Sequence, residues 1–285
     1  MNRKSVRQAF RGLTATVLAT ASFGVLAAPV TLWSFQIDSG FSAYSPTSGI
    51  TPSAFNTNLA PPDFPLFPVG GLPSKLSWGS GTSGQSSIAV GEATNGTFSG
   101  QVITNGAAVN TVQLTHVNNP ITGTSLSTAT LFDRIILQSL DPASASKETE
   151  LLVFTINFIE TPNQAPCAVT TSPTPCNDIF VLNVAGAGFN PADNSLNQPF
   201  QYDGEWYNAL LQIEGLGPLE ASACSAAGVG SGCIGFTTVE NQTNTFQVKL
   251  QITDRPFFVP EPASLGLLSL GLIGLGLARR RGKAA

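Results

Sequence analysis

Strict alternation of apolar and polar side chains is the feature that most limits what this chain can fold into. From Phe246 to Ile252 every second residue is apolar and the residues between are polar, a period of two that turns one face of a β-strand toward a core. Comparable runs occupy 31–37, 87–90, 97–103, 111–117, 130–140, 152–158, 179–184 and 206–213. Clusters of Gly, Pro, Asn and Ser separate them, so we predict an all-β fold: a single β-sandwich or jelly-roll-like domain, with helix mainly at the two chain ends.

The composition agrees with a folded body. The chain has 285 residues, of which 42% are hydrophobic and 11% charged. This is too apolar for a disordered chain and too polar for a protein with several membrane spans. The stretch 28–256 is long enough for a sizeable core, and no repeat of solenoid or propeller length divides it. We therefore expect one domain over 28–256.

Basic residues gather at the two ends of the chain. Four of the 13 basic residues precede Gly12 and four follow Ala278, whereas all 17 acidic residues lie between Asp38 and Glu261. The middle of the chain, with five basic and 17 acidic residues, carries a net charge of −12. A body this acidic repels phosphate backbones, which argues against DNA or RNA as a partner.

Residues 1–27 have the three parts of a secretory signal peptide. Basic residues occur up to Arg11, an apolar run extends from Leu13 to Leu26, and small residues occupy the −3 and −1 positions of a cleavage site after Ala27. We expect signal peptidase to cut there. A retained membrane anchor is the alternative, but the apolar run is short for one.

The C-terminal segment 257–285 mirrors the N-terminus. It contains Pro260, Glu261 and Pro262, then an uncharged stretch over 263–278, and then Arg279, Arg280 and Arg281. Sixteen helical residues extend about 24 Å, less than the roughly 30 Å of a hydrocarbon core, so we expect a short transmembrane helix. The positive-inside bias holds both basic ends in the cytoplasm and exports the acidic body.

This terminal segment resembles the PEP-CTERM sorting signal of Gram-negative bacteria that make exopolysaccharide. The resemblance rests on the Pro-Glu-Pro motif, the apolar stretch and the final Arg run. It implies recognition by a membrane-embedded exosortase, transient anchoring in the inner membrane, cleavage near the motif, and delivery to the cell surface or extracellular matrix. The alternative is an ordinary tail anchor, which needs neither the motif nor so short a span.

Residues 41–73 are the least periodic part of the body. The segment contains seven prolines, with Phe55, Phe64, Leu66 and Phe67 between them. We expect a long loop that lies against the sandwich, rather than a flexible linker.

The four cysteines fall in two similar segments. Eight residues separate Cys167 from Cys176, and eight separate Cys224 from Cys233. Four cysteines allow three connectivities, of which sequential pairing favours two local disulfides in an exported protein. Neither spacing is the close pair of a zinc knuckle and the chain has one histidine, so we expect no zinc and no other cofactor, with calcium as the open possibility.

The segment Thr115-His116-Val117-Asn118 resembles the motif that names the THxN PEP-CTERM proteins. The resemblance extends over nearly the whole body, through Leu76–Gly79, Phe158–Asn163, Pro175–Phe180 and Cys233–Thr237. It implies the architecture and the export route. It implies no catalytic residue, because the family has no assigned activity.

Polar residues end two of the apolar stripes. His116 continues the inward face of its strand, and Glu160 continues that of the run 152–158, so both side chains are expected at the rim of the core. We predict a hydrogen-bonded network that ties the strand ends to the first cysteine loop and consists of His116, Asn118, Glu160 and Asn163. A ligand or metal site is the alternative, since buried polar groups must be paired whether or not they act.

The sequence shows no recognisable catalytic constellation, and a Gly-x-Ser-x-Gly elbow is absent. Paired carboxylates for glycoside cleavage remain an alternative, for which the candidates are Glu148, Glu150, Glu160, Glu205 and Glu214. Calcium ligands at Asp193, or at Asp203 and Glu205, are another, although both segments favour turns.

Together these features predict a non-enzymatic protein of the cell surface or extracellular matrix, with a structural or binding role and exopolysaccharide as a candidate partner. Its expected processing partners are signal peptidase and exosortase. The alternative functions are a polysaccharide-processing enzyme and a calcium-dependent adhesin.

Overall fold

The computed structural model describes residues 28–183, 188–190 and 193–254. These residues form a nearly all-β structure of antiparallel sheets, as the alternation predicts. The predicted signal peptide 1–27, with its cleavage residue Ala27, and the predicted sorting segment 257–285 lie outside the described residues. Within the described ranges, no helix is long and apolar enough to cross a membrane.

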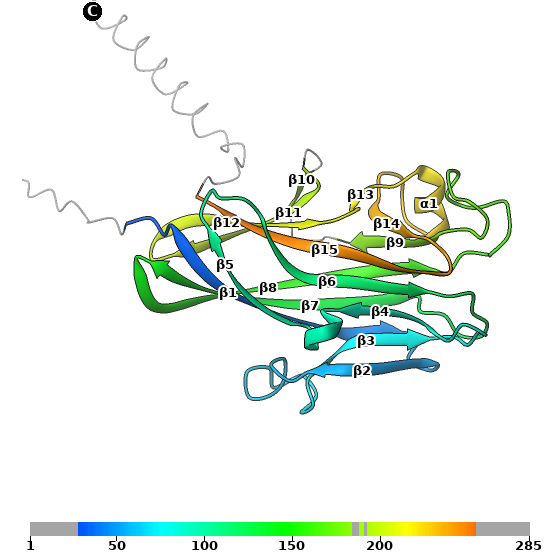
Figure 1. The fold of residues 1–285 in the computed structure, drawn as a ribbon, viewed down its shortest axis with the longest axis horizontal. Coiled ribbons are helices and arrows are strands. Elements are labelled where there is room, and N and C mark those ends of the chain that lie inside the picture. The colour runs from blue at the N-terminus through cyan, green and yellow to red at the C-terminus, as the bar shows by residue number, and fades with distance from the viewer. Residues whose placement is uncertain (1–27, 184–187, 191–192, 255–285) are drawn as a thin grey trace, which may run out of the picture.

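The strands form two antiparallel sheets that run along the long axis of the molecule (Figure 1). The first sheet contains β1 (Leu32–Ser45), β5 (Thr97–Ile103), β7 (Thr128–Asp141), β8 (Ala143–Ile159), β9 (Asp178–Asn183), β13 (Gly217–Pro218) and β14 (Ile234–Thr238), in the spatial order β13-β14-β9-β8-β7-β1-β5. The second contains β2 (Ile50–Asn56), β3 (Leu72–Trp78), β4 (Ser86–Val90), β6 (Val109–Asn118), β10 (Gly188–Asn190), β11 (Ser195–Tyr202), β12 (Glu205–Ile213) and β15 (Gln242–Thr253), in the order β10-β11-β12-β15-β6-β4-β3-β2. The described helices are short: η1 (Glu92–Thr94) and α1 (Ala221–Ala226).

One hydrophobic core joins the two sheets. Each long strand turns alternate residues inward, so that β1 contributes Trp33, Phe35 and Ile37 from one sheet and β15 contributes Leu250 and Ile252 from the other, each at most 3% exposed. Burying a side chain of this kind stabilises the fold by roughly 1.5–3 kcal/mol. The period of two that predicts the strands therefore also assembles the core.

Every alternating run predicted from the sequence is a strand: β1, β4, β5, β6, β7, β8, β9, β12 and β15. The strands that the prediction missed are β2, β3, β10, β11, β13 and β14. Of these, β10 and β13 are too short to show a period, and proline interrupts the pattern in β2, β3 and β11. In β14 the pattern is broken by Gly235, where an added Cβ would lie 1.9 Å from the Phe180 carbonyl oxygen.

The predicted loop over 41–73 is wrong for about half of its length. β1 continues to Ser45 and β2 occupies Ile50–Asn56, so the loop before β3 covers only 57–71. The physical reason is that β2 is the edge strand of its sheet, where a strand tolerates Pro52 without losing a ladder hydrogen bond.

The remaining loop 57–71 lies against the body, as predicted. The rings of Phe64 and Phe67 pack against Phe132 of β7 at centroid distances of 5.3 and 5.0 Å. These rings form a small separate cluster together with Leu59 and Leu72.

Both predicted disulfides are confirmed. Cys167 is joined to Cys176 with an S–S distance of 2.03 Å, and Cys224 is joined to Cys233 at 2.10 Å. The two loops also pack together, because Val169 and Ala223 share a small apolar cluster. The disulfides therefore stabilise one unit that covers β9.

The start of the first strand and the end of the last strand lie side by side. The Thr104 N–H donates to the Thr31 carbonyl at 3.0 Å, and the Asn105 N–H donates to the Ile252 carbonyl at 2.8 Å. The turn after β5 thus joins both strands just before the described chain ends at Asp254, at the end of the molecule away from α1 (Figure 1).

Candidate functional site

Several strands place a polar residue where their inward stripe ends, and these strand ends meet. Consecutive antiparallel strands alternate in direction, so the end of β8, the start of β9 and the end of β14 fall on the same side of the sheet. The second sheet brings the ends of β3 and β6 to the same place. The end of β6 pairs with the start of β15, and β15 follows the end of β14 along the chain. The polar residues at this junction are Trp78, His116, Asn118, Glu160, Asp178, Thr238 and Glu240.

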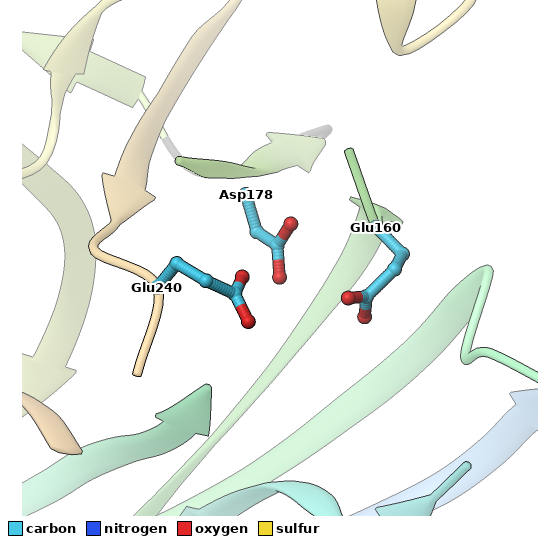
Figure 2. A group of neighbouring side chains, drawn as sticks. All are labelled: Glu160, Asp178 and Glu240. Atoms are coloured by element: carbon cyan, nitrogen blue, oxygen red, sulfur yellow. The ribbon is translucent and has the colours of Figure 1, made fainter. Parts of the chain in front are cut away.

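Three carboxyl groups point toward one another at this junction (Figure 2). Glu160 follows β8, Asp178 begins β9, and Glu240 lies in the turn between β14 and β15. One oxygen from each group lies within 4.8 Å of the other two. Asp178 is 0% exposed and Glu240 4%, and both carboxylate oxygens of Glu160 are shielded from solvent. We call these three residues the carboxylate cluster.

Asp178 is held in place by the residue that follows Glu160. The Thr161 N–H donates to Asp178 Oδ1 at 2.8 Å. The Thr161 hydroxyl donates to the carbonyl oxygens of Cys176 and Asn177, both at 3.1 Å. The first disulfide loop is thereby tied to the end of β8.

The other oxygens of the carboxylate cluster have no hydrogen-bond donor. They are both oxygens of Glu160, both of Glu240, and Oδ2 of Asp178. The Trp78 indole N–H faces Glu160 and the Asn118 amide faces Glu240. Each offsets part of the rise in pKa that burial causes, but neither pair meets hydrogen-bond geometry. Burying an acceptor without a donor costs free energy, so a bound proton or cation would stabilise the cluster.

Burial shifts the titration of the whole cluster toward neutral pH. Loss of hydration, reinforced by repulsion from Glu240, raises the pKa of Glu160 to about 7. Loss of hydration and repulsion from Glu160 raise the pKa of Asp178 to about 8 despite the Thr161 hydrogen bonds. Burial also raises the pKa of Glu240. Three carboxyl groups at this spacing cannot all carry an uncompensated charge.

His116 lies beside the cluster in an aromatic environment. Its ring stacks on Trp78 with centroids 5.7 Å apart and meets Phe158 and Phe180 edge to face at 5.4 and 4.9 Å. Its Nδ1 is 3.0 Å from the Thr238 hydroxyl. Burial lowers the pKa of His116 to about 3, so the ring is neutral at physiological pH.

Asn118 links the histidine strand to the turn that carries Glu240. Its Nδ2 donates to the Thr238 carbonyl at 3.3 Å, and its Oδ1 has no partner although the residue is 0% exposed. Thr238 therefore contacts His116 through its hydroxyl and Asn118 through its carbonyl, two residues before Glu240.

The structure places three of the four residues of the predicted network at this junction, but Glu160 is not hydrogen-bonded to the other two. His116 and Asn118 share Thr238, and Trp78 contacts the His116 ring while facing Glu160. Asn163 was wrongly included: it is exposed, and within the described ranges no hydrogen bond joins it to the other three. The reason is that the chain turns outward after the buried Thr161, so its next polar side chain faces solvent.

The prediction missed Asp178 and Glu240, although the sequence carries a signal for both. Asp178 has the same parity as the inward residues Phe180 and Leu182. Glu240 has the same parity as Phe236 and Thr238 in β14. The stripe rule that selected His116 and Glu160 therefore selects these residues as well.

The other candidate residues lie apart from the cluster. Asp203 and Gly204 form the two-residue turn between β11 and β12, with φ angles of +49° and +89°. Asp193 accepts hydrogen bonds from the N–H and the hydroxyl of Ser195 at 3.1 and 2.6 Å. Both segments are turns, the interpretation that the sequence favoured. The carboxyl cluster found among the described residues includes Glu160 and none of the other candidate glutamates, Glu148, Glu150, Glu205 and Glu214.

Comparison with known proteins identifies the C-terminus. No curated protein matches this chain. A family model matches the segment that contains the predicted sorting residues, which lie outside the described residues. These residues are Pro260, Glu261, Pro262, Arg279, Arg280 and Arg281. Residues 258–281 match the PEP-CTERM protein-sorting motif, which supports a PEP-CTERM protein and implies exosortase-dependent export to the cell surface.

Proposed function

We propose that this protein is a non-enzymatic component of the cell surface or exopolysaccharide matrix of a Gram-negative bacterium. In this proposal signal peptidase removes residues 1–27, the C-terminal segment anchors the chain transiently in the inner membrane, and an exosortase cuts near Pro260. The body is a β-sandwich of the THxN type with a structural or binding role. The observation that carries the proposal is the match of residues 258–281 to the sorting motif.

The chemistry of the body supports this role. Its two disulfides suit an oxidising location outside the cytoplasm. Removal of both ends leaves five basic and 16 acidic residues, a net charge of −11. Such a surface favours neutral sugars, cationic partners or cation-bridged contacts over anionic polymers.

The alternative of a polysaccharide-processing enzyme finds less support in the geometry. Glycosidases place two carboxyl groups about 5–9.5 Å apart on either side of a cleft that admits the sugar. The carboxylate cluster is close to the lower end of this spacing, but its oxygens are shielded from solvent. A sugar ring has no access to a group in that position.

Replacing Pro260, Glu261 and Pro262 together by alanine tests the proposal. We expect the variant to accumulate in the membrane fraction of a host with an exosortase, whereas the native protein partitions to the matrix and the medium. The melting temperature of the body is the control and stays unchanged, because the three residues lie outside it. Normal release of the variant would remove the central support of the proposal.

A further inference from the structure

The carboxylate cluster concentrates negative charge without a basic partner. Ion pairs in the described part of the chain join Lys75 to Glu92, and Arg134 to Asp38 and Asp63. None of them includes Glu160, Asp178 or Glu240. With their oxygens within 4.8 Å of one another, these groups repel each other strongly at low local dielectric, and a bound cation removes that repulsion.

A second observation also points to a cation at the carboxylate cluster. Asn118 is 0% exposed and its amide faces Glu240, yet Asn118 Oδ1 has no hydrogen-bond partner. A buried amide oxygen of this kind nearly always binds a donor or a metal. This unpaired oxygen is a candidate neutral ligand from the second sheet, beside three carboxylates from the first sheet and the turn that follows it.

We propose that Glu160, Asp178, Glu240 and Asn118 form a calcium-binding site at the junction of the two sheets. The donor set consists of oxygens, which hard cations prefer. Zinc is a poor fit because it favours nitrogen and sulfur ligands, and the nitrogens of His116 are not part of the group of mutually close ligand atoms.

The dimensions of the cluster suit calcium. Calcium–oxygen distances of about 2.3–2.6 Å place opposite ligands roughly 4.6–5.2 Å apart. The three carboxylate oxygens lie within 4.8 Å of one another, so one ion can contact all of them. Magnesium requires near-ideal octahedral geometry and usually retains several waters, which the solvent-shielded oxygens do not favour.

Calcium at this position connects strands that are distant in sequence. Asn118 ends β6, Glu160 follows β8, Asp178 begins β9, and Glu240 follows β14. The ion therefore joins the two sheets where their strands end, beside the first disulfide loop. This site is additional to the sorting motif and does not depend on the route of export.

The test uses the exported protein, purified and freed of metal with EDTA. We expect calcium in roughly hundredfold excess over its Kd to raise the melting temperature by about 5–10 °C, with one calcium bound per chain by titration calorimetry. Absence of both effects between pH 6 and pH 8.5 would show that the cluster holds protons only and would overturn the proposal. Stabilisation by magnesium or zinc but not by calcium would also contradict it.

Matched variants separate this site from other carboxylates. Glu160→Gln is nearly isosteric and removes one charge from the cluster, so we expect it to fold in EDTA but to lose the calcium-induced shift and at least tenfold in calcium affinity. Glu150→Gln, in the strand that Glu160 follows, and Asp203→Asn, which preserves the β11–β12 turn, are expected to bind calcium as the native protein does. Native calcium binding by Glu160→Gln, or its loss in Asp203→Asn, contradicts the proposed site.

Discussion

Asp133 shows what one buried polar residue does to the energetics of this body. Its side chain lies on the inward face of β7 and lines a cavity of about 40 Å³ among apolar residues such as Leu131, Ile135 and Phe154. Its Oδ1 is shielded from solvent. Loss of hydration raises the pKa of Asp133 to about 6, and the nearby Ser39 hydroxyl offsets this only in part.

This shift predicts a pH dependence of stability. Because the folded pKa of Asp133, about 6, exceeds the ordinary value of 3.8, its protonated form stabilises the folded state below pH 3.8 and this contribution is lost as the pH rises through 6. The native protein should lose about 2–3 kcal/mol more unfolding free energy than Asp133→Asn between pH 4 and pH 7. Denaturant unfolding measures the difference, and parallel pH curves would show that Asp133 is ionised in the folded state.

For single residues, the sequence predicted which face of a strand a side chain occupies better than it predicted which side chains lie together. The parity rule correctly placed His116 and Glu160 at the rim of the core, because strand geometry alone decides which face a side chain occupies. It could not predict that Asp178 and Glu240 approach Glu160, since that contact depends on which strands become neighbours. Asn163 was misplaced because it lies four residues beyond the end of β8, where the chain no longer follows the alternation of the strand.

At the scale of elements, Arg134 of β7 holds the loop 57–71 in place. Its Nη2 and Nε donate to Asp38 Oδ2 at 2.7 and 3.2 Å, and its Nη1 donates to Asp63 Oδ2 at 3.2 Å. Its Nη2 also donates to the Asn58 carbonyl at 3.1 Å. Although burial opposes it, hydrogen bonds from Asn58, Arg134 and other neighbours hold the pKa of Asp38 below its usual value.

Replacing Arg134 therefore should release this loop. Arg134→Met retains most of the apolar stem but leaves the fully buried Asp38 without its ion-pair partner, which we expect to cost about 3–5 kcal/mol of unfolding free energy. Limited proteolysis with a protease of broad specificity should then cut first within 57–71. Asp63→Asn is the control, because Asp63 is 64% exposed and its loss should cost less than about 1 kcal/mol. Equal resistance of the two variants would contradict a clamp by Arg134.

The elements that the sequence failed to predict are those whose stabilisation is not local. β2 pairs with β3, and β3 pairs with β4. The buried positions of β3 include Ser74 as well as Leu76 and Trp78. A mixed stripe with prolines carries little periodic signal, whereas the long stripes of β8 and β15 are unmistakable. Strands of this kind form because a neighbouring strand offers hydrogen bonds, and a single sequence does not reveal that neighbour.

At the scale of the whole molecule, the carboxylate cluster and the C-terminal end of the described chain lie at opposite ends of β15. The cluster contains Glu240, just before β15 begins, and the described chain stops at Asp254, just after it ends. A strand of 12 residues separates the two regions by about 40 Å. The carboxylate cluster thus lies at the end of the body away from Asp254.

The sequence was most informative about this scale. The basic residues at both ends and the Pro-Glu-Pro motif are linear features of the chain, and the match of residues 258–281 supports the predicted sorting signal at the C-terminus. The cation site, by contrast, depends on four residues from four separate segments and emerges only from the fold.

Intact-mass spectrometry of the protein recovered from the medium of a host with an exosortase tests the central claim most directly. We predict a chain that begins at Ala28 and ends near Pro260, without Arg279, Arg280 and Arg281. Recovery of a released chain that still carries this arginine run would contradict export through the sorting motif.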